Sequence, residues 1–191
     1  GNGLKYIKDK ILLCHPGVFI NRFHKGDKRN VGLDLSKEEI EERFSVITSK
    51  EPYYISPNII FLGEIPHTYE FEEKSTVYVD DTGNIDYIPD DSALVIIEDN
   101  ELIIISGCAH SGICNITEYA KEITGIKDIK AVIGGFHLKK QSYQTRKTII
   151  YFKDNPVRYL LPSHCTQLPA MSLFHENFRI KQVKSGNVYN F

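Results

Sequence analysis

The sequence predicts an α/β fold with α+β layers, in which helices pack against a β-sheet. Short β-rich segments punctuated by proline and glycine fill the first half of the chain, whereas strand and helix patterns alternate in the second half. This order of elements is typical of a sheet packed against helices. The chain has 191 residues, enough to bury a core, and no linker or low-complexity segment divides it. We therefore expect a single domain over residues 1–191.

One helix start is well marked in the first half of the chain. Ser36 is followed three residues later by Glu39, and serine and glutamate at this spacing form a capping box. We expect this helix to run to about Phe44. Around it we expect the end of a short helix at 4–8, strands at 11–14, 53–55, 59–62 and 76–79, and a polar surface loop at 24–35.

The second half of the chain opens with a β-hairpin pattern. Two apolar runs, 94–97 and 102–105, flank the turn residues Asp99 and Asn100. A short turn of this kind between apolar runs is a hairpin signal. Alternating elements follow, and we expect helices at 112–123 and 143–153, strands at 131–133 and 157–161, and a closing pair of strands at 180–183 and 187–191.

Composition places the chain among ordinary globular proteins. Apolar residues make up 41% and charged residues 25%, and the formal net charge is -2. Neither a basic block nor an apolar run of the roughly 20 residues that span a bilayer is present, so we expect no nucleic-acid partner and no membrane. The cysteines are too few for a disulfide scaffold, which favours a reducing cytoplasm. They are Cys14, Cys108, Cys114 and Cys165.

Three histidines follow three apolar strand patterns, each in a context of small residues. His110, His137 and His164 succeed one another at intervals of 27 residues, about the length of one strand–helix unit. Because parallel strands end at one edge of a sheet, where α/β folds hold their ligands, we expect these side chains to meet there. Imidazole and thiolate are ligands that zinc prefers. The pattern favours a metal site, with His110, His164 and Cys108 as candidate ligands.

His137 fits a catalytic role at the same edge. It follows two glycines, which permit a close approach of the backbone to a ligand. We assign it a contact with the substrate or the transition state, and metal ligation is the alternative. The helix expected after His110 begins at this edge, where its amino terminus suits an anion or a polarised water.

Simpler roles compete with each of these assignments. A histidine at a strand end can merely hydrogen-bond its turn, and Cys108 can serve as a small buried apolar side chain or as a nucleophile. His15 either lines the cleft or supports the fold. We interpret the other candidates as structural: Cys114 in the core, His24, His67 and His175 at the surface or in loops, and the acidic pairs 80–81 and 90–91 as solvated turns.

Five segments resemble the metallo-β-lactamase superfamily. They are similar to its subgroup of metal-dependent hydrolases that includes dihydropterin–ribofuranosylaminobenzene phosphate synthases, and they follow the family's order over essentially the whole chain. The longest are Ile-Ile-Ser-Gly-Cys-Ala-His-Ser-Gly-Ile at 104–113, Ala-Val-Ile-Gly-Gly-Phe-His-Leu at 131–138 and Pro-Ser-His-Cys-Thr at 162–166. Gly-Glu-Ile-Pro at 63–66 and Cys-His-Pro at 14–16 also match.

The resemblance implies an αββα sandwich with one or two metal ions in a cleft between the sheet edges. The ions are usually zinc, with manganese and iron as alternatives. By motif, His164 matches the late metal-ligand histidine, the loop 107–110 matches another metal-binding segment, and His137 matches a position facing the cleft. The implied chemistry is a metal-activated water attacking an ester, phosphoester or amide of a small-molecule substrate.

The chain departs from the family pattern in two places. The superfamily motif His-x-His-x-Asp-His is absent from the 191 residues, and in relatives it lies just before a segment like the one at 1–6. The resemblance therefore implies an N-terminally incomplete domain, about its C-terminal two thirds. Gln167 also replaces the glycine that usually follows His-Cys-Thr.

Two functions from different classes are consistent with these patterns. The first is a metal-dependent hydrolase-like protein, inactive where the upstream motif is missing. The second is a non-catalytic remnant whose bared sheet and helix faces associate with a partner or with another copy, as a dimer. A His-x-His-x-Asp-His stretch upstream in the full gene would favour the enzyme.

Overall fold

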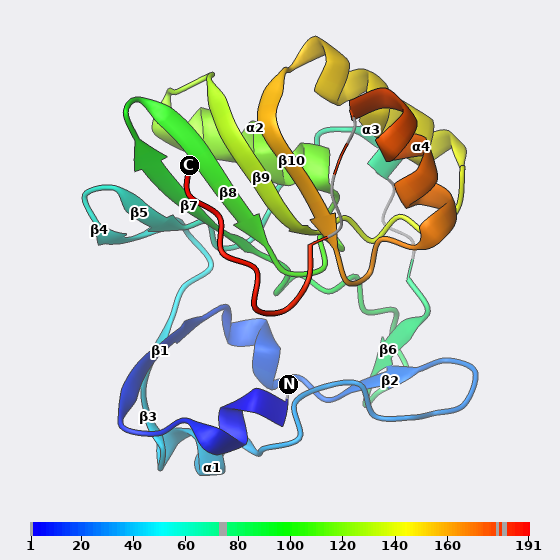
Figure 1. Cartoon of the computed structure of the whole chain (residues 1–191). Coiled ribbons are helices and arrows are strands. Elements are labelled where there is room, and N and C mark those ends of the chain that lie inside the picture. Colours follow the sequence, from blue (N-terminus) through cyan, green and yellow to red (C-terminus); the bar gives the residue numbers. More distant parts are fainter. Residues whose placement is uncertain (1, 73–75, 179, 181–182) are drawn as a thin grey trace. The chain divides into compact units, whose positions relative to one another are not determined.

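A computed structural model of the chain contains two compact units (Figure 1). The first unit comprises Gly1–Glu51 and Lys74–Asp90, and the second comprises Pro52–Glu73 and Asp91–Phe191. This division does not test the single domain expected from the sequence, which stays a prediction. The structure describes residues 2–72, 76–178, 180 and 183–191.

Within the described residues, the second unit is built on a six-stranded mixed sheet. In spatial order its strands are β10 (Val157–Ser163), β9 (Ile129–Gly135), β8 (Glu101–Ser106), β7 (Ala93–Glu98), β5 (Ile59–Phe61) and β4 (Tyr53–Ser56). Strands β8, β9 and β10 run parallel, and β7, β5 and β4 continue the sheet as antiparallel neighbours. The β-sheet that the sequence predicts is therefore present in this unit.

The β7–β8 hairpin forms as the sequence predicts. Its two strands pair without interruption, from Ala93 opposite Ser106 to Glu98 opposite Glu101. Asp99 and Asn100 form the turn with φ angles of 52° and 62°. Two-residue hairpin turns need this left-handed backbone, which aspartate and asparagine tolerate better than most residues. Local turn chemistry thus sets the register of the two strands.

Helices pack against this sheet. Helix α2 (Ile113–Thr124) lies against β8, α3 (Tyr143–Asp154) lies beside α2, and α4 (Leu168–Phe178) lies beside α3 (Figure 1). In the described part of the chain, no helix combines the length and apolar character of a bilayer span. The helices predicted at 112–123 and 143–153 are confirmed. Side chains that fill the core include Val95, Ile104, Ile116, Val132, Phe136, Phe152 and Phe174.

A buried carboxylate caps the amino terminus of α2. Glu72 is 2% exposed and accepts hydrogen bonds from the backbone N–H groups of Cys114 at 3.0 Å and Asn115 at 2.7 Å. Gly112 permits this approach, because a Cβ there would collide with the Glu72 carboxylate. Burial raises the pKa of Glu72 to about 7. The expectation that this helix start holds an outside anion is wrong, since Glu72 already occupies it.

The first unit, in its described residues, contains two small strand pairs. Its elements are η1 (Asn2–Tyr6), β1 (Lys10–Cys14), η2 (Pro16–Phe19), β2 (Arg22–His24), α1 (Lys37–Glu41), β3 (Phe44–Thr48) and β6 (Tyr78–Asp80). Strand β1 pairs with β3 in parallel, and β2 pairs with β6 antiparallel. Ser36 and Glu39 form the predicted capping box at the start of α1.

A buried arginine ties this first unit together. Arg22 is 7% exposed, and its guanidinium donates hydrogen bonds to Asp86 at 2.8 Å and to Asp90 at 2.5 Å. A buried charge needs such partners, and removing one of them leaves the other uncompensated. The prediction that Asp90 belongs to a solvated turn is therefore wrong.

Two predicted boundaries in the first unit are also wrong. Helix α1 ends at Glu41 rather than near Phe44, because Phe44 is buried and opens β3, which the sequence did not indicate. The strand expected at 76–79 is displaced to β6, where it pairs with β2. In both cases strand pairing with a distant segment overrides the local pattern.

The carboxyl-terminal part of the chain differs most from prediction. The sequence pattern misses α4, whose second residue is Pro169, although proline is tolerated in the first turn of a helix. The closing strands are not found: Ile180, Val183 and residues 187–191 lie in no strand, and residues 181–182 fall outside the described part. Chain ends have few neighbours, so apolar character alone predicts strands there poorly.

We expect the stability of the second unit to depend on pH through Glu72. Its pKa of about 7 exceeds the ordinary 4.5 of the unfolded chain, so the folded state binds this proton more tightly. The stabilising contribution is complete below pH 4.5 and is lost as the pH rises to 7. The variant Glu72→Gln does not titrate, so its comparison with the wild type isolates the contribution of the Glu72 carboxyl group to stability.

The free energy of unfolding of the wild type, measured in urea relative to Glu72→Gln, should fall by about 3 kcal/mol over that pH range. Near-ultraviolet circular dichroism of both proteins controls for a change of fold. A difference between them that stays constant with pH would contradict the assignment.

Candidate functional site

The ends of β8, β9 and β10 lie level at one edge of the six-stranded sheet. Ser163 of β10 pairs with Gly135 of β9. The backbone N–H of Gly135 donates to the carbonyl of Gly107, just beyond β8, at 2.8 Å. The three loops that carry the predicted histidines therefore start at one place, as the sequence indicates.

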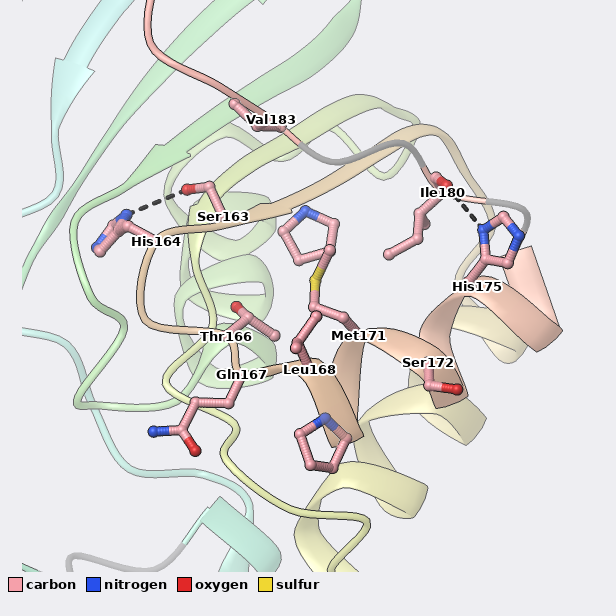
Figure 2. A pocket seen from close by; sticks show the side chains of 12 residues that line it. Ser163, His164, Thr166, Gln167, Leu168, Met171, Ser172, His175, Ile180 and Val183 are labelled. Carbon is pink, nitrogen blue, oxygen red and sulfur yellow. Dashed lines mark hydrogen bonds between the residues drawn. The ribbon is translucent and has the colours of Figure 1, made fainter.

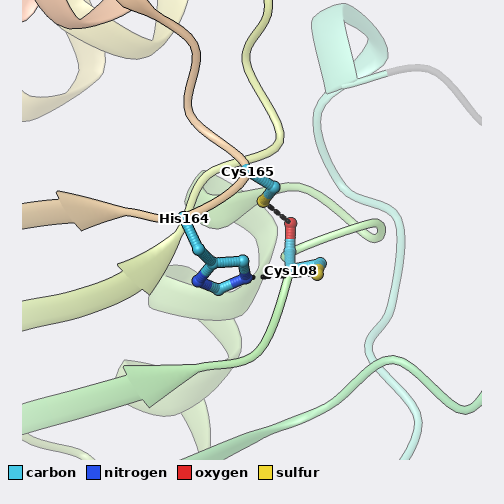
Figure 3. Close-up of side chains that lie close together, drawn as sticks. All are labelled: Cys108, His164 and Cys165. Carbon is cyan, nitrogen blue, oxygen red and sulfur yellow. Dashed lines mark hydrogen bonds between the residues drawn. The ribbon is translucent and has the colours of Figure 1, made fainter. Parts of the chain in front are cut away.

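Two cysteines and a histidine meet where β8 and β10 end (Figure 3). Cys108 follows β8, and His164 and Cys165 follow β10. One ligand atom from each of them lies within 4.8 Å of the others. Cys108 Sγ is 3.2 Å from His164 Nε2, and Cys165 Sγ is 3.5 Å from the carbonyl oxygen of Cys108. These atoms form a compact group of soft and borderline metal donors.

Gly135 makes this approach possible. A Cβ at this position would collide with Cys165 Sγ and would lie 2.6 Å from His164 Nε2. The two side chains therefore rest directly on the backbone of β9. From the sequence, the paired glycines are expected to let a ligand approach the backbone. In the structure, the groups that approach Gly135 are side chains of the site itself, His164 and Cys165.

The pKa values of the two thiols are shifted in opposite directions. A hydrogen bond from Cys108 lowers the pKa of Cys165 to about 7, and the same bond raises the pKa of Cys108 to about 11. The backbone N–H of His137 also donates to Cys165 Sγ, at 3.3 Å. Near neutral pH, Cys165 is thus the thiol that ionises first, while Cys108 keeps its proton.

His110 and His137 face each other beside this group. Their ring centroids lie 4.2 Å apart with an interplanar angle of 39°. Burial, together with the nearby Lys139, lowers the pKa of His137, so its ring stays neutral at pH 7. Among the described residues, no group hydrogen-bonds His137 Nδ1, which is buried. His110 also acts on the Cys108 thiol, whose pKa it lowers, and so links the pair of rings to the cysteines.

Asp91 is a site residue that sequence reasoning missed. It is 8% exposed, and its carboxylate accepts a hydrogen bond from the backbone N–H of Ser111 at 2.9 Å. Burial raises its pKa, and the hydrogen bond from the Ser111 backbone opposes that rise. The prediction of a solvated turn is wrong for Asp91. An acidic pair in turn-rich sequence carries no signal of burial.

The predicted ligands are only partly brought together. Cys108 and His164 lie in the three-donor group, whereas His110 lies outside it, against His137. Cys165, which the sequence left without a role, is the third member. Metal ligation by Cys108, His110 and His164, and catalysis by His137, stay predictions. Cys114 lies in the core and His67 and His175 are exposed, as expected.

A pocket of about 920 Å³ opens next to His164 (Figure 2). His164 lies at one end of it, and His175 and Ile180 lie at the other. The hydroxyl of Ser163 lies 3.1 Å from His164 Nδ1, which leaves Nε2 facing Cys108. The rest of the wall combines apolar and polar side chains: Pro162, Thr166, Gln167, Leu168, Pro169, Met171, Ser172 and Val183.

No family model matches the chain. A protein of unassigned function from Methanocaldococcus jannaschii is 32% identical over 179 residues, covering 90% of this chain and 66% of that protein. A second protein of the same organism, named 7,8-dihydropterin-6-methyl-4-(beta-D-ribofuranosyl)-aminobenzene-5'-phosphate synthase, is 31% identical over 202 residues, covering 98% of this chain and 69% of that protein.

A solved structure shows the same fold. The crystal structure of a metal-dependent hydrolase of the β-lactamase superfamily superposes with a TM-score of 0.80 and 26% identity. The match covers 94% of this chain and 70% of that one. The chain thus spans about two thirds of the length of the proteins it resembles. The predicted fold class is confirmed.

We expect Cys165 to react as a thiolate at neutral pH. Alkylation by iodoacetamide, followed at Cys165 by peptide mass spectrometry, should be half-maximal near pH 7, the pKa that the Cys108 hydrogen bond sets. Cys108→Ala removes that bond and should move the midpoint toward the ordinary value of 9. Cys14→Ala, in the first unit, should leave it unchanged. A midpoint near 9 in the wild type would contradict the assigned bond.

We expect Gly135→Ala to disrupt the same group of side chains. The added Cβ must push His164 and Cys165 away from β9, so the Cys165 alkylation midpoint should rise above pH 7. Gly107→Ala is the matched control, because a Cβ there meets nothing within 4 Å. Circular dichroism checks that both variants fold. Equal midpoints in the two variants would show that Gly135 does not support the site.

Proposed function

The chain belongs to the metallo-β-lactamase superfamily, and from this premise we propose that it is a metal-dependent hydrolase. The observation that carries the proposal is the position of its donor group. Cys108 and His164 meet at the edge where parallel strands end, which is where open α/β sheets hold their ligands.

The residues at this edge fit a divalent cation. Cys108 Sγ and His164 Nε2 lie 3.2 Å apart, and imidazole and thiolate are donors typical of zinc; His110 lies beside them, against His137. We assign Cys108, His110 and His164 as ligands, with zinc as the cation and manganese or iron as alternatives. When bound, such a cation polarises the electrophile and lowers the pKa of a coordinated water to about 7.

The surrounding side chains orient these ligands. The Ser163 hydroxyl at 3.1 Å from His164 Nδ1 fixes the ring so that Nε2 faces the donor group. The buried carboxylate of Asp91 accepts a hydrogen bond from the backbone N–H of Ser111 and so fixes the loop that carries His110.

We assign His137 the catalytic contact. Its lowered pKa keeps the ring neutral at pH 7, and its buried Nδ1 has no hydrogen-bond partner among the described residues. A neutral imidazole with an available nitrogen can accept a proton or hydrogen-bond a charged oxygen of the substrate. Its backbone is left-handed, with φ of 50°, a conformation that costs free energy for a residue with a side chain.

The substrate we propose is a small molecule with an ester, phosphoester or amide bond. The pocket beside His164 has the volume of sites that hold such molecules. Pro162, Leu168 and Met171 would contact its apolar part, and Gln167 and Ser172 its polar part. The name of the second relative favours another candidate, a synthase acting on a dihydropterin. Product analysis with and without a dihydropterin separates the two.

The hydrolase is tested with the product of the full gene, loaded in turn with zinc, manganese and iron. We expect hydrolysis of bis(p-nitrophenyl) phosphate or p-nitrophenyl acetate, lowered at least about 100-fold in His164→Ala and His137→Ala. The exposed His67→Ala is the control and should keep full activity. Turnover that His164→Ala leaves unchanged, or none with any of the three metals, would overturn the proposal.

A further inference from the structure

We infer that Cys165 is a metal ligand and that Cys108, His164 and Cys165 form a thiolate-rich cation site. This inference rests on the metal site of the proposed function and changes its donor set. It adds a second sulfur that neither the sequence pattern nor the comparisons assign. The site would take borderline and soft divalent cations, namely Zn²⁺, Co²⁺ or Cd²⁺.

The spacing of the donors supports this set. Donors around a tetrahedral zinc ion lie about 3.5–3.8 Å apart, given Zn–N and Zn–S bonds of about 2.0 and 2.3 Å. Cys108 Sγ and His164 Nε2 are 3.2 Å apart, and all three donor atoms lie within 4.8 Å of one another. These separations are close to those around a single tetrahedral ion.

The backbone holds the donors in place before any ion binds. The end of β10 carries His164 and Cys165 next to each other, and β9 places Gly135 beneath both. The loop after β8 brings Cys108 to them, tied to β9 by the bond between Gly107 and Gly135. Preorganised donors lower the entropic cost of binding.

The donor atoms of this set determine which metal ions the site prefers. Two thiolates and an imidazole favour zinc, cobalt and cadmium over magnesium and manganese, which prefer oxygen. Three protein ligands leave the fourth position open, as in zinc sites that activate water. His164 is exposed and the two cysteines are partly buried, so that position is accessible to solvent.

The test is a Co²⁺ titration of the whole chain, with the thiols kept reduced by tris(2-carboxyethyl)phosphine. Thiolate ligation gives intense near-ultraviolet charge-transfer absorption, which imidazole and carboxylate ligation do not give. We expect this band at one equivalent of Co²⁺ and its disappearance when Zn²⁺ is added. Cys165→Ser and Cys108→Ser should each lower it by roughly half and weaken binding at least about tenfold. Cys14→Ser is the matched control and should change nothing.

The possible failures are distinguishable. A wild-type band that Cys165→Ser leaves intact would overturn the inference, while the proposed hydrolase would keep Cys108 as its sulfur ligand. Co²⁺ binding without a charge-transfer band would also overturn it. No binding at all would overturn both the inference and the metal site of the proposed function. Cadmium NMR of the wild type reports the number of thiolates directly and needs no folded variant.

Discussion

The level pairing of β8, β9 and β10 is the constraint on which the rest of the second unit depends. Ser163 pairs with Gly135, and Gly135 is tied to Gly107, so the loops after the three strands begin side by side. Parallel strands require long crossover connections, and α2 and α3 supply them. The spacing of the histidines in the sequence follows from these strand–helix units.

Two carboxylates are buried near this edge, and each of them has a structural reason. Glu72 satisfies the first N–H groups of α2, a role that water would otherwise fill. Asp91 is held by the backbone of Ser111, on the loop that also carries His110. Burying a carboxylate in this way costs free energy unless it is hydrogen-bonded. Hydrogen-bonded carboxylates, as well as apolar packing, therefore hold the loops at this edge in place.

The sequence was sufficient for the parts of the fold that local patterns determine. Apolar runs located β7 and β8, the turn residues Asp99 and Asn100 located their hairpin, and the capping box at Ser36 located the start of α1. The recurrence of histidine after apolar strands located the edge of the sheet. These features depend on hydrophobic periodicity, turn residues and helix-capping residues, all of which are visible within a short stretch of sequence.

The parts that were missed depend on contacts between distant segments. The burial of Asp91 and Glu72 arises from tertiary packing, so their sequence context gives no sign of it. Cys165 joins Cys108 only because β10 and β8 end at the same level. Phe44 enters β3 because β1 lies beside it. A local pattern cannot supply this information, which is why the candidate site was predicted less completely than the sheet.

The most direct measurement is an anomalous-difference map from crystals of the zinc-loaded chain, recorded at the zinc edge. Our account predicts a peak at the ends of β8 and β10, within about 2.0–2.3 Å of His164 Nε2 and Cys108 Sγ. A map with no peak there, or with zinc bound only at other residues, would contradict the claim that this edge is a metal site.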